Sequence, residues 1–468
     1  MEHGVIERYE DNQLAVAIPD LAAVRGALRH CAAGVEEEDA VGVEVKDEDH
    51  DDRLGLALLT LKGVRDAAAK LRATDGELVE RANQARRPES PARGAEPSDL
   101  DLVICWLRRH FASAYGGWVP TIGKNRVIEP VRGLPYIGGG GEGVPYLGGH
   151  GDPSADRSAN GGTRAEAPRP SASPPAWPPR RANPGQGVRV GVLDTPLYPN
   201  AWLAGAYRAA PCDLLPAAGS SILPASAGHA TFVAGLILRR APGAELLIRP
   251  ALDEQAVGRA WAVAKDMASF IGSGADILNL SFGCYTDDGE PPLVLARAVS
   301  LLSAEILLVA AAGNHGDIDE LRAEGKLADE PWTRGLTSKT PMWPAAFDEV
   351  IAVGATDGNE LAAFSPRTPW VDLTAPGVNV ESTYLRGKVK LAAPPGGSPT
   401  EGSPTEGSRT VTFSNGFAYW AGTSFAAAAV SGAVAARILP GRCGAQQALA
   451  YICESPEDGI RPFTEPGS

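Results

Sequence analysis

Almost continuous apolar runs alternate with helix-like segments through the second half of the chain. The runs are VRVGVLD, ELLIRP, ADILNLSFG, EILLVAAAGN and VIAVGAT, which lie between Val188 and Thr356. Strands that are buried on both faces have this composition, and their alternation with helices is typical of a parallel sheet covered on both sides. The predicted fold class is therefore α/β, with a doubly wound, mostly parallel sheet. Ligands of such sheets bind at the carboxyl ends of the strands.

Composition divides the rest of the chain. Short apolar segments mixed with helix-like stretches predict a small α/β domain at the N-terminus, in which the charged run KDEDHDD is interpreted as a hairpin loop rather than a metal site. A region rich in Gly, Pro and Ser follows and predicts a disordered linker. The predicted boundaries are 1–130 for the N-terminal domain, 131–186 for the linker, 187–455 for the sheet domain with irregular insertions at 316–340 and 387–409, and 456–468 for a tail.

Charge and cysteine content exclude several classes of protein. The formal net charge of −14 argues against a nucleic-acid partner and against an anionic membrane surface. No apolar run is long enough to span a bilayer, and the acidic N-terminus lacks a signal-like apolar segment, so a cytoplasmic location is expected. The cysteines are scattered without metal-ligand spacing, which predicts reduced thiols and no metal or cofactor. Only export would favour a bridge between Cys443 and Cys453.

The stretch GTSFAAAAVSG, from Gly422 to Gly432, places Ser424 at the start of a small-residue helix. A serine hydroxyl is a weak nucleophile unless a base activates it. Of the seven histidines, only two lie in the sheet domain. His229, in GHATFVAGL, is expected at a helix N-terminus that faces the crevice, whereas His315 is expected to cap a loop.

The order of these residues along the chain restricts the type of catalytic site. No histidine follows Ser424, which excludes the Ser, Asp, His order of α/β-hydrolases, and the GxSxG pattern is absent at this serine. The alternating strands and helices argue against an all-β framework of the chymotrypsin type. The remaining order is Asp194, His229, Ser424, which is the order found in subtilisin.

Several sequence blocks, in the same order, resemble the subtilisin-type (S8) serine peptidases from Val188 to about Cys453. VGVLDT resembles the aspartate block of that family, GHATFVAG the histidine block and GTSFAAAAVSG the serine block. LNLSFG resembles the substrate-strand block and AAGN the oxyanion block. WPAAFDEVIAVGA and FSPRTPWVDLTAPG resemble the segments that precede the serine.

The resemblance implies a role for each matching residue. Asp194 would orient His229, His229 would exchange a proton with Ser424, and Ser424 would form an acyl-enzyme with a polypeptide substrate. An oxyanion would be bound by Asn314 together with the backbone N–H of Ser424. An extended substrate would pair with the backbone of Ser281, Phe282 and Gly283. The other residues expected to bind the substrate are Ala311, Ala312 and Gly313.

Other interpretations remain open. The chain departs from the family pattern at Pro196, Ala230 and Ala428, which keeps a peptide-binding protein without turnover in competition with an endopeptidase. An esterase is a third candidate. The N-terminal domain is interpreted either as an inhibitory propeptide or as a recruitment module with its own partner. The long linker argues against the first, because a propeptide is expected to abut the domain that it inhibits.

Overall fold

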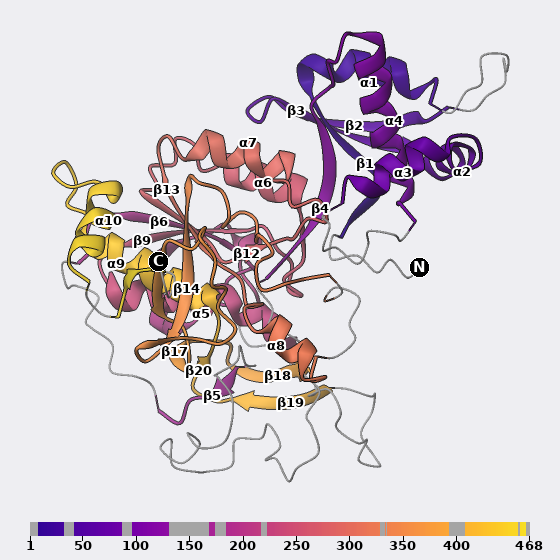
Figure 1. Cartoon of the computed structure of the whole chain (residues 1–468). Coiled ribbons are helices and arrows are strands. Elements are labelled where there is room, and N and C mark those ends of the chain that lie inside the picture. The colour runs from indigo at the N-terminus through magenta and orange to yellow at the C-terminus, as the bar shows by residue number, and fades with distance from the viewer. Residues whose placement is uncertain are drawn as a thin grey trace.

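The computed structural model describes two packed units (Figure 1). Residues 8–130 contribute the smaller unit, and residues 184–464 contribute the larger unit, to which residues 168–173 also belong. The residues described are 8–31, 42–86, 96–130, 168–173, 184–216, 222–327, 333, 335–392, 408–456 and 459–464.

The N-terminal unit is an antiparallel sheet in the order β4-β1-β3-β2, with helices on one face. The order of strands and helices confirms a small α/β unit. Its elements are β1 (Tyr9–Ala17), α1 (Leu21–Leu28), β2 (Glu44–Asp51), β3 (Leu56–Lys62), α2 (Val64–Thr74), α3 (Gly76–Gln84), α4 (Asp99–Ala114) and β4 (Ile122–Pro130).

Both faces of this sheet are buried, but against different partners. Side chains of a strand alternate between the two faces. Leu14 and Val16 of β1 pack with the helices of the N-terminal unit. Ala15 and Ala17 belong instead to a core that includes Trp261 of the larger unit. The second face of the N-terminal sheet is therefore an interface, and Figure 1 shows α6 and α7 lying between the two sheets.

The charged run KDEDHDD is not a loop, so that prediction was wrong. Most of the run lies in β2, which is the outermost strand of the sheet and pairs only with β3. Because an edge strand has one exposed side, it tolerates charged side chains that a central strand would exclude.

A nine-stranded sheet forms the centre of the larger unit, in the order β21-β16-β14-β13-β11-β6-β9-β7, with β15 paired to β14. All pairs are parallel except those of β15 and β21. The strands are β6 (Arg189–Asp194), β7 (Tyr207–Arg208), β9 (Glu245–Pro250), β11 (Ile277–Leu280), β13 (Leu307–Ala311), β14 (Val350–Asp357), β15 (Glu360–Leu361), β16 (Leu373–Pro376) and β21 (Arg461–Pro462).

Helices cover both faces of this sheet, which confirms the doubly wound α/β class. Val190 and Val192 of β6 face a core shared with α5 and α9, while Leu193 faces the core shared with α6 and α7. The helices are α5 (His229–Arg240), α6 (Ala260–Ala268), α7 (Leu293–Leu302), α8 (Ile318–Ala323), α9 (Thr423–Arg437) and α10 (Ala445–Glu454).

Short strands extend these layers. They are β5 (Arg169–Pro170), β8 (Leu223–Pro224), β10 (Gly258–Arg259), β12 (Phe282–Gly283), β17 (Val380–Thr383), β18 (Gly387–Ala392), β19 (Ser408–Phe413) and β20 (Phe417–Trp420). Strands β17, β20 and β5 form one small sheet, and β19, β18 and β8 form another. Strands β10 and β12 both pair with β4.

The linker and the insertions contain more structure than their composition predicts. Strand β5 lies within the predicted linker, the rest of which is largely outside the described residues. The ends of the 387–409 insertion form the β18–β19 hairpin, paired from Gly387 opposite Phe413 to Ala392 opposite Ser408, while residues 393–407 lie outside the described part. Helix α8 lies inside the 316–340 insertion. In each case pairing or packing on the larger unit supplies the order that composition alone does not.

A matched pair of leucines in β3 tests the two faces of the N-terminal sheet. Leu59 is fully buried under the helices of its own unit, whereas Leu58 faces the larger unit. Leu59→Ala is expected to lower the free energy of unfolding of the N-terminal unit by about 2–5 kcal/mol through the cavity that it leaves. Hydrogen exchange of α4 amides against denaturant concentration measures this loss. Leu58→Ala leaves its cavity between the two units, so it is expected also to speed the exchange of α6 amides, which Leu59→Ala leaves unchanged. Unchanged α6 exchange in Leu58→Ala would contradict the assignment of the faces.

Candidate active site

A buried carboxylate and a buried imidazole form the centre of the site. Asp194 is the last residue of β6 and His229 is the first residue of α5. Both carboxylate oxygens lie 2.8 Å from His229 Nδ1. The backbone N–H of Thr195 also donates to Asp194 Oδ1, at 2.7 Å. The carboxylate is thus held from two sides, and the imidazole orientation is fixed.

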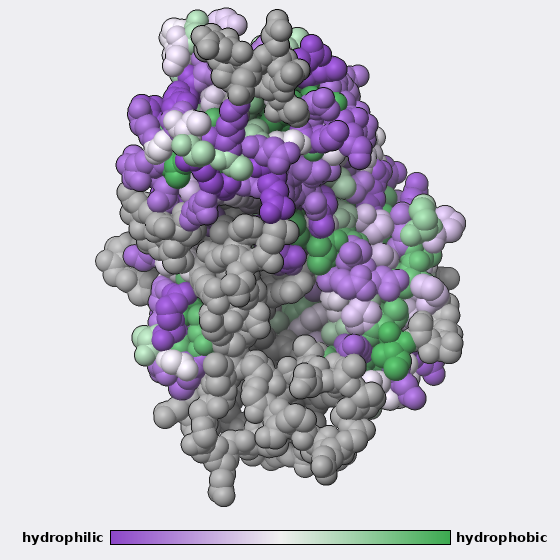
Figure 2. Space-filling model, turned by 90° about the vertical axis from the view of Figure 1, so that its right-hand side faces the viewer, coloured by the Kyte–Doolittle hydropathy of each residue, from purple (hydrophilic) through white to green (hydrophobic). Residues whose placement is uncertain are grey.

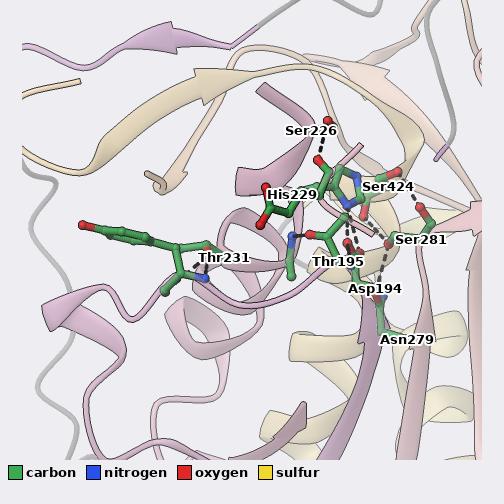
Figure 3. A network of polar contacts seen from close by, with 11 residues as sticks. Asp194, Thr195, Ser226, His229, Thr231, Asn279, Ser281 and Ser424 are labelled. Atoms are coloured by element: carbon green, nitrogen blue, oxygen red, sulfur yellow. Dashed lines mark hydrogen bonds and ion pairs between the residues drawn. The ribbon is translucent and has the colours of Figure 1, made fainter. Parts of the chain in front are cut away.

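Helices α5 and α9 run side by side and bring His229 close to Ser424. A Cβ added at Gly432 of α9 would lie 2.8 Å from the carbonyl oxygen of Ile237 in α5. Gly432 lies as many residues after Ser424 as Ile237 lies after His229, so the first turns of the two helices are level. The ring of Phe425 then lies 5.6 Å from the imidazole, centre to centre. Figure 3 shows Asp194, His229 and Ser424 gathered in one polar network.

The Ser424 side chain is held on the side of β11 rather than by the imidazole. Its hydroxyl donates to the carbonyl oxygen of Ser281 at 3.3 Å. Ser281 Oγ lies 3.1 Å from the Ser424 carbonyl oxygen and 2.9 Å from Asn279 Oδ1. Within the described residues, no hydrogen bond joins Ser424 Oγ to His229. The Ser424 hydroxyl must therefore give up its hydrogen bond to Ser281 before it can pass its proton to His229.

Asn314 is fixed against the N-terminus of α9. Its Oδ1 accepts hydrogen bonds from the backbone N–H of Thr423, at 3.0 Å, and from Thr423 Oγ1, at 3.1 Å. Because the amide oxygen faces Thr423, the NH₂ group, which can only donate, points away from that residue and lies near Gly422, where an added Cβ would lie 3.4 Å from Asn314 Nδ2. The free N–H groups of a helix N-terminus add further donors beside it.

Thr423 and Asn279 were not selected from the sequence. Thr423 Oγ1 accepts from Gly313 N–H at 3.1 Å and so joins the AAGN segment to the serine helix. Asn279 Nδ2 donates to Ser431 Oγ at 3.1 Å and ties β11 to α9. Both residues lie in blocks that resemble the family, Thr423 in GTS and Asn279 in LNLS. Only their neighbours Ser424 and Ser281 were given roles from the sequence.

The predicted substrate strand is already paired with the chain itself. Phe282 and Gly283 form β12, which runs antiparallel to β4 of the N-terminal unit, with Phe282 opposite Pro130 and Gly283 opposite Glu129. On its other edge, β4 pairs with β10, with Gly258 opposite Ile128. The strand β10 was not predicted as part of the cleft, because a two-residue strand has too little sequence pattern to be detected.

The other predicted cleft residues lie at the carboxyl end of β13. Ala311 is the last residue of that strand, and the N–H of Ala312 donates to the Val353 carbonyl oxygen at 3.0 Å. Gly313 follows with a φ of 114°, which favours glycine. All three residues are buried directly before Asn314. Their position fits a wall of the cleft, but their contact with a substrate stays a prediction.

His315 does not join the site. Its Nε2 lies 2.9 Å from the Thr340 carbonyl oxygen, and its Nδ1 lies 3.1 Å from the Tyr285 hydroxyl. In the 316–340 insertion, Asp317 is buried, and Asp319 accepts hydrogen bonds from Arg322 and Ser338. The described residues contain no group of three or more His, Cys, Asp or Glu side chains that could hold a metal ion.

Comparison with known proteins assigns the family. The model of the subtilase family (Peptidase_S8) matches residues 185–439, so the chain belongs to that family. It is similar to the "Thermostable alkaline protease" of Halalkalibacterium halodurans, with 33% identity over 216 residues, covering 43% of this chain and 50% of the relative. It is also similar to "Subtilisin Savinase" of Lederbergia lenta, with 32% identity over 213 residues, covering 43% of this chain and 67% of the relative.

The chain spans half the length of the first of these relatives. Among solved structures, a lanthipeptide protease matches 57% of this chain and 80% of its own, with 24% identity and a TM-score of 0.38. The protease domain of PatA, as an S218A mutant, matches 55% of this chain and 81% of its own, with 28% identity and a TM-score of 0.38.

Thr423 provides a test of the oxyanion geometry. Thr423→Val removes the hydroxyl that bonds both Asn314 and Gly313, so only the backbone N–H of residue 423 still holds the Asn314 amide, which gains freedom to shift. Turnover of a peptide substrate is expected to fall about 10- to 100-fold, because a displacement of about 1 Å can have an effect of this size. Thr423→Ser keeps the hydroxyl and is expected to retain most activity. Equal activity of all three proteins would show that Asn314 does not depend on this bond.

Proposed function

We propose that this subtilase is a serine endopeptidase that hydrolyses peptide bonds in extended polypeptides. The observation that carries the proposal is the arrangement of the buried Asp194–His229 pair level with Ser424 at the N-terminus of α9. Nucleophilic catalysis by serine needs such a base, oriented by a third group. The names of the similar proteases support the same activity.

The geometry gives each side chain a step in the reaction. An ionised carboxylate only accepts hydrogen bonds, so Asp194 keeps the proton of His229 on Nδ1 and leaves Nε2 as the base. His229 accepts the proton of Ser424 as Ser424 Oγ attacks the substrate carbonyl, and returns that proton to the leaving amine. Asn314 and the N–H groups at the start of α9 stabilise the oxyanion. Water then attacks the acyl-enzyme. His229 accepts a proton from the water and returns it to Ser424 Oγ as the ester bond breaks.

The departures from the family pattern leave this chemistry in place. Ala230 is fully buried, and its N–H donates to Thr195 Oγ1 at 3.2 Å. Ala428 continues α9 without interruption. Pro196 lies two residues after Asp194, and the backbone N–H that donates to the Asp194 carboxylate belongs to Thr195. None of the three removes a donor or acceptor from the triad, so we favour hydrolysis over peptide binding without turnover, and over an esterase.

Ser424→Ala tests the nucleophile. The variant is expected to lose labelling by a fluorophosphonate probe and to lose peptide hydrolysis by about a million-fold, the size of the loss that removal of the nucleophile causes in subtilisin. Ser431→Ala is a matched control, because Ser431 is a buried serine of the same helix that bonds Asn279 instead of the triad. Equal labelling of the wild type and Ser424→Ala would contradict the assignment, and peptide capture without hydrolysis would favour the binding protein.

We also propose that the N-terminal unit inhibits the enzyme by occupying its substrate strands. Strand β4 lies between β10 and β12 and pairs antiparallel with both, as an extended substrate would. The carbonyl oxygen of Ser281, next to β12, accepts a hydrogen bond from the Ser424 hydroxyl. The end of β4, opposite Phe282, therefore lies near the residue that bonds the nucleophile.

Contacts outside β4 also favour a stable complex of the two units. Helix α6 has no side-chain cap of its own, and Asn125 Oδ1 accepts from the backbone N–H of Trp261 at 2.9 Å. Asp49 Oδ2 accepts from Trp261 Nε1 at 2.7 Å and from Lys265 Nζ at 2.8 Å. The Lys265 and Trp261 hydrogen bonds lower the pKa of Asp49. These contacts tie the N-terminal unit to a helix of the catalytic unit.

The long linker does not oppose this role. The entropy cost of closing a loop grows only with the logarithm of its length, so a tether of this size permits docking as well as a short one does. The length of the linker therefore does not favour a recruitment module over an inhibitory propeptide. In Figure 2 the upper part of the molecule, which is the N-terminal unit, is mainly hydrophilic, while hydrophobic side chains gather below it on the larger unit.

Self-cleavage tests the inhibitory role. The purified wild type is expected to cut its own chain within a few residues after Pro130 and to gain activity as the N-terminal fragment leaves, while Ser424→Ala stays intact. Leu58→Asp places a charge in the interface and is expected to raise activity before release; Lys70→Asp, in α2 away from β4, is the control. Mass spectrometry identifies the site of the cut, and a time course of peptide hydrolysis measures the activity of each protein. Full activity of the uncut wild type would contradict inhibition.

A cytoplasmic location remains a proposal. The six cysteines, all within the described residues, form no disulfide, which supports a reducing compartment. No helix of the described part has the length and apolar character needed to cross a membrane. One similar protease, from Bacillus subtilis, is named as extracellular, so the location needs direct measurement by fractionation.

A further inference from the structure

One edge of the strand that leads to the catalytic serine is covered by a segment of the linker. Strand β20 pairs with β17 on one side and with β5 on the other. The β5 pairing is antiparallel, with Ala418 opposite Pro170 and Tyr419 opposite Arg169. Three residues after Trp420, the last residue of β20, the chain reaches Thr423 and the start of α9.

The segment is anchored by side chains as well as by the backbone. Pro168 and Ser171 are buried, although the neighbouring residues are exposed. Ser171 N–H donates to the Phe417 carbonyl oxygen at 3.2 Å, and Asn415 Nδ2 donates to the Ser171 carbonyl oxygen at 3.0 Å. The Ser171 hydroxyl donates to the Glu381 carboxylate. Arg169 Nη2 donates to Asn379 Oδ1 at 2.6 Å.

Local propensity does not explain this strand. The surrounding linker is rich in Gly, Pro and Ser, a composition that cannot form a core of its own. Six residues, 168–173, are nevertheless placed against β20 and β17. Their order must come from the surface that they bind, since an exposed strand edge pairs readily with an added strand and side-chain contacts then set the register.

Strand β20 is important because of the aromatic residue at its end. The Trp420 ring lies 5.8 Å from the His229 ring, at an angle of 86°, and 5.0 Å from the Phe425 ring. It also contacts Phe232 of α5, with 5.6 Å between ring centres. A shift of β20 would therefore move the aromatic wall against which the catalytic imidazole packs.

We infer that the edge of β20 is a binding site for an extended Pro-Arg-Pro-Ser peptide, which residues 168–173 of this chain occupy. The bound segment holds β20 and thereby positions Trp420 against His229. Trp420 and Ser171 are positioning residues, since neither touches the reacting atoms. The inference does not rest on the inhibitory role of the N-terminal unit. A cut shortly after Pro130 would leave residues 168–173 joined to the catalytic unit.

Replacement of the segment in the full-length chain tests the binding site. Residues 168–173 are replaced by six Gly and Ser residues in the Ser424→Ala background, which prevents self-cleavage. The control carries the same replacement at 151–156, elsewhere in the linker. Hydrogen exchange of a peptide that covers Phe417–Trp420 is expected to speed up at least tenfold in the first protein and to stay unchanged in the control. Unchanged exchange in both would overturn the inference.

Activity and rescue separate positioning from simple destabilisation. In the background with Ser424 intact, the replacement is expected to lower kcat at least fivefold with little change in KM. A synthetic peptide of residues 165–176 is expected to restore kcat with a saturable dose response, and the same peptide with Arg169→Ala and Ser171→Ala is expected to restore less. Faster exchange with unchanged kcat would overturn the positioning role, and so would failure of the native peptide to restore turnover.

A milder variant covers the case in which the replacement does not fold. Ser171→Ala with Arg169→Ala keeps the backbone of the segment and removes the side-chain contacts to Glu381 and Asn379. It is expected to speed the exchange of the Phe417–Trp420 peptide and to lower kcat, each by less than the full replacement does. Wild-type values in both measurements would overturn the assignment of these side chains as anchors.

Discussion

The close, level packing of α5 against α9 is the constraint on which the site depends. The two helices begin at residues that must meet, His229 and Ser424, and contact along their length sets how near those residues lie. Small side chains make this possible, because an added Cβ at Gly432 would collide with the backbone of α5. The alanine run of α9 therefore has a geometric purpose, and the nearly complete burial of that helix follows from it.

The same packing explains why the flanking polar residues are where they are. A helix that is buried along its whole length still has unpaired N–H groups at its start, and these need partners. Asn314 satisfies part of this demand, because its Oδ1 accepts from the backbone N–H of Thr423. Asn279 and Ser431 fix the helix to β11 farther along. Structural and chemical requirements are thus met by the same few side chains.

Sequence reasoning was effective where residue order and long periodic segments carried the information. The alternating runs predicted the doubly wound sheet, and the absence of a histidine after Ser424 led to Asp194 and His229. It was weaker where a partner surface supplies the order. Strand β5 has two residues and lies in a Gly/Pro/Ser-rich segment, so only the edge of β20 explains it. Most of the KDEDHDD run lies in an edge strand, but its charged composition is typical of a loop. The position of β4 depends on pairing between residues far apart in the chain, which the sequence pattern does not contain.

The two-sided burial of β1 has a consequence for the fate of the N-terminal unit. Ala15, Ala17 and Leu58 are covered only while that unit stays on the catalytic unit. Once separated, it would present an apolar sheet face and the unpaired edge of β4 to the solvent, which are features that promote aggregation and proteolytic attack. Under the proposed inhibitory role, departure would then be a one-way event, because a fragment that is degraded could not bind the enzyme and inhibit it again.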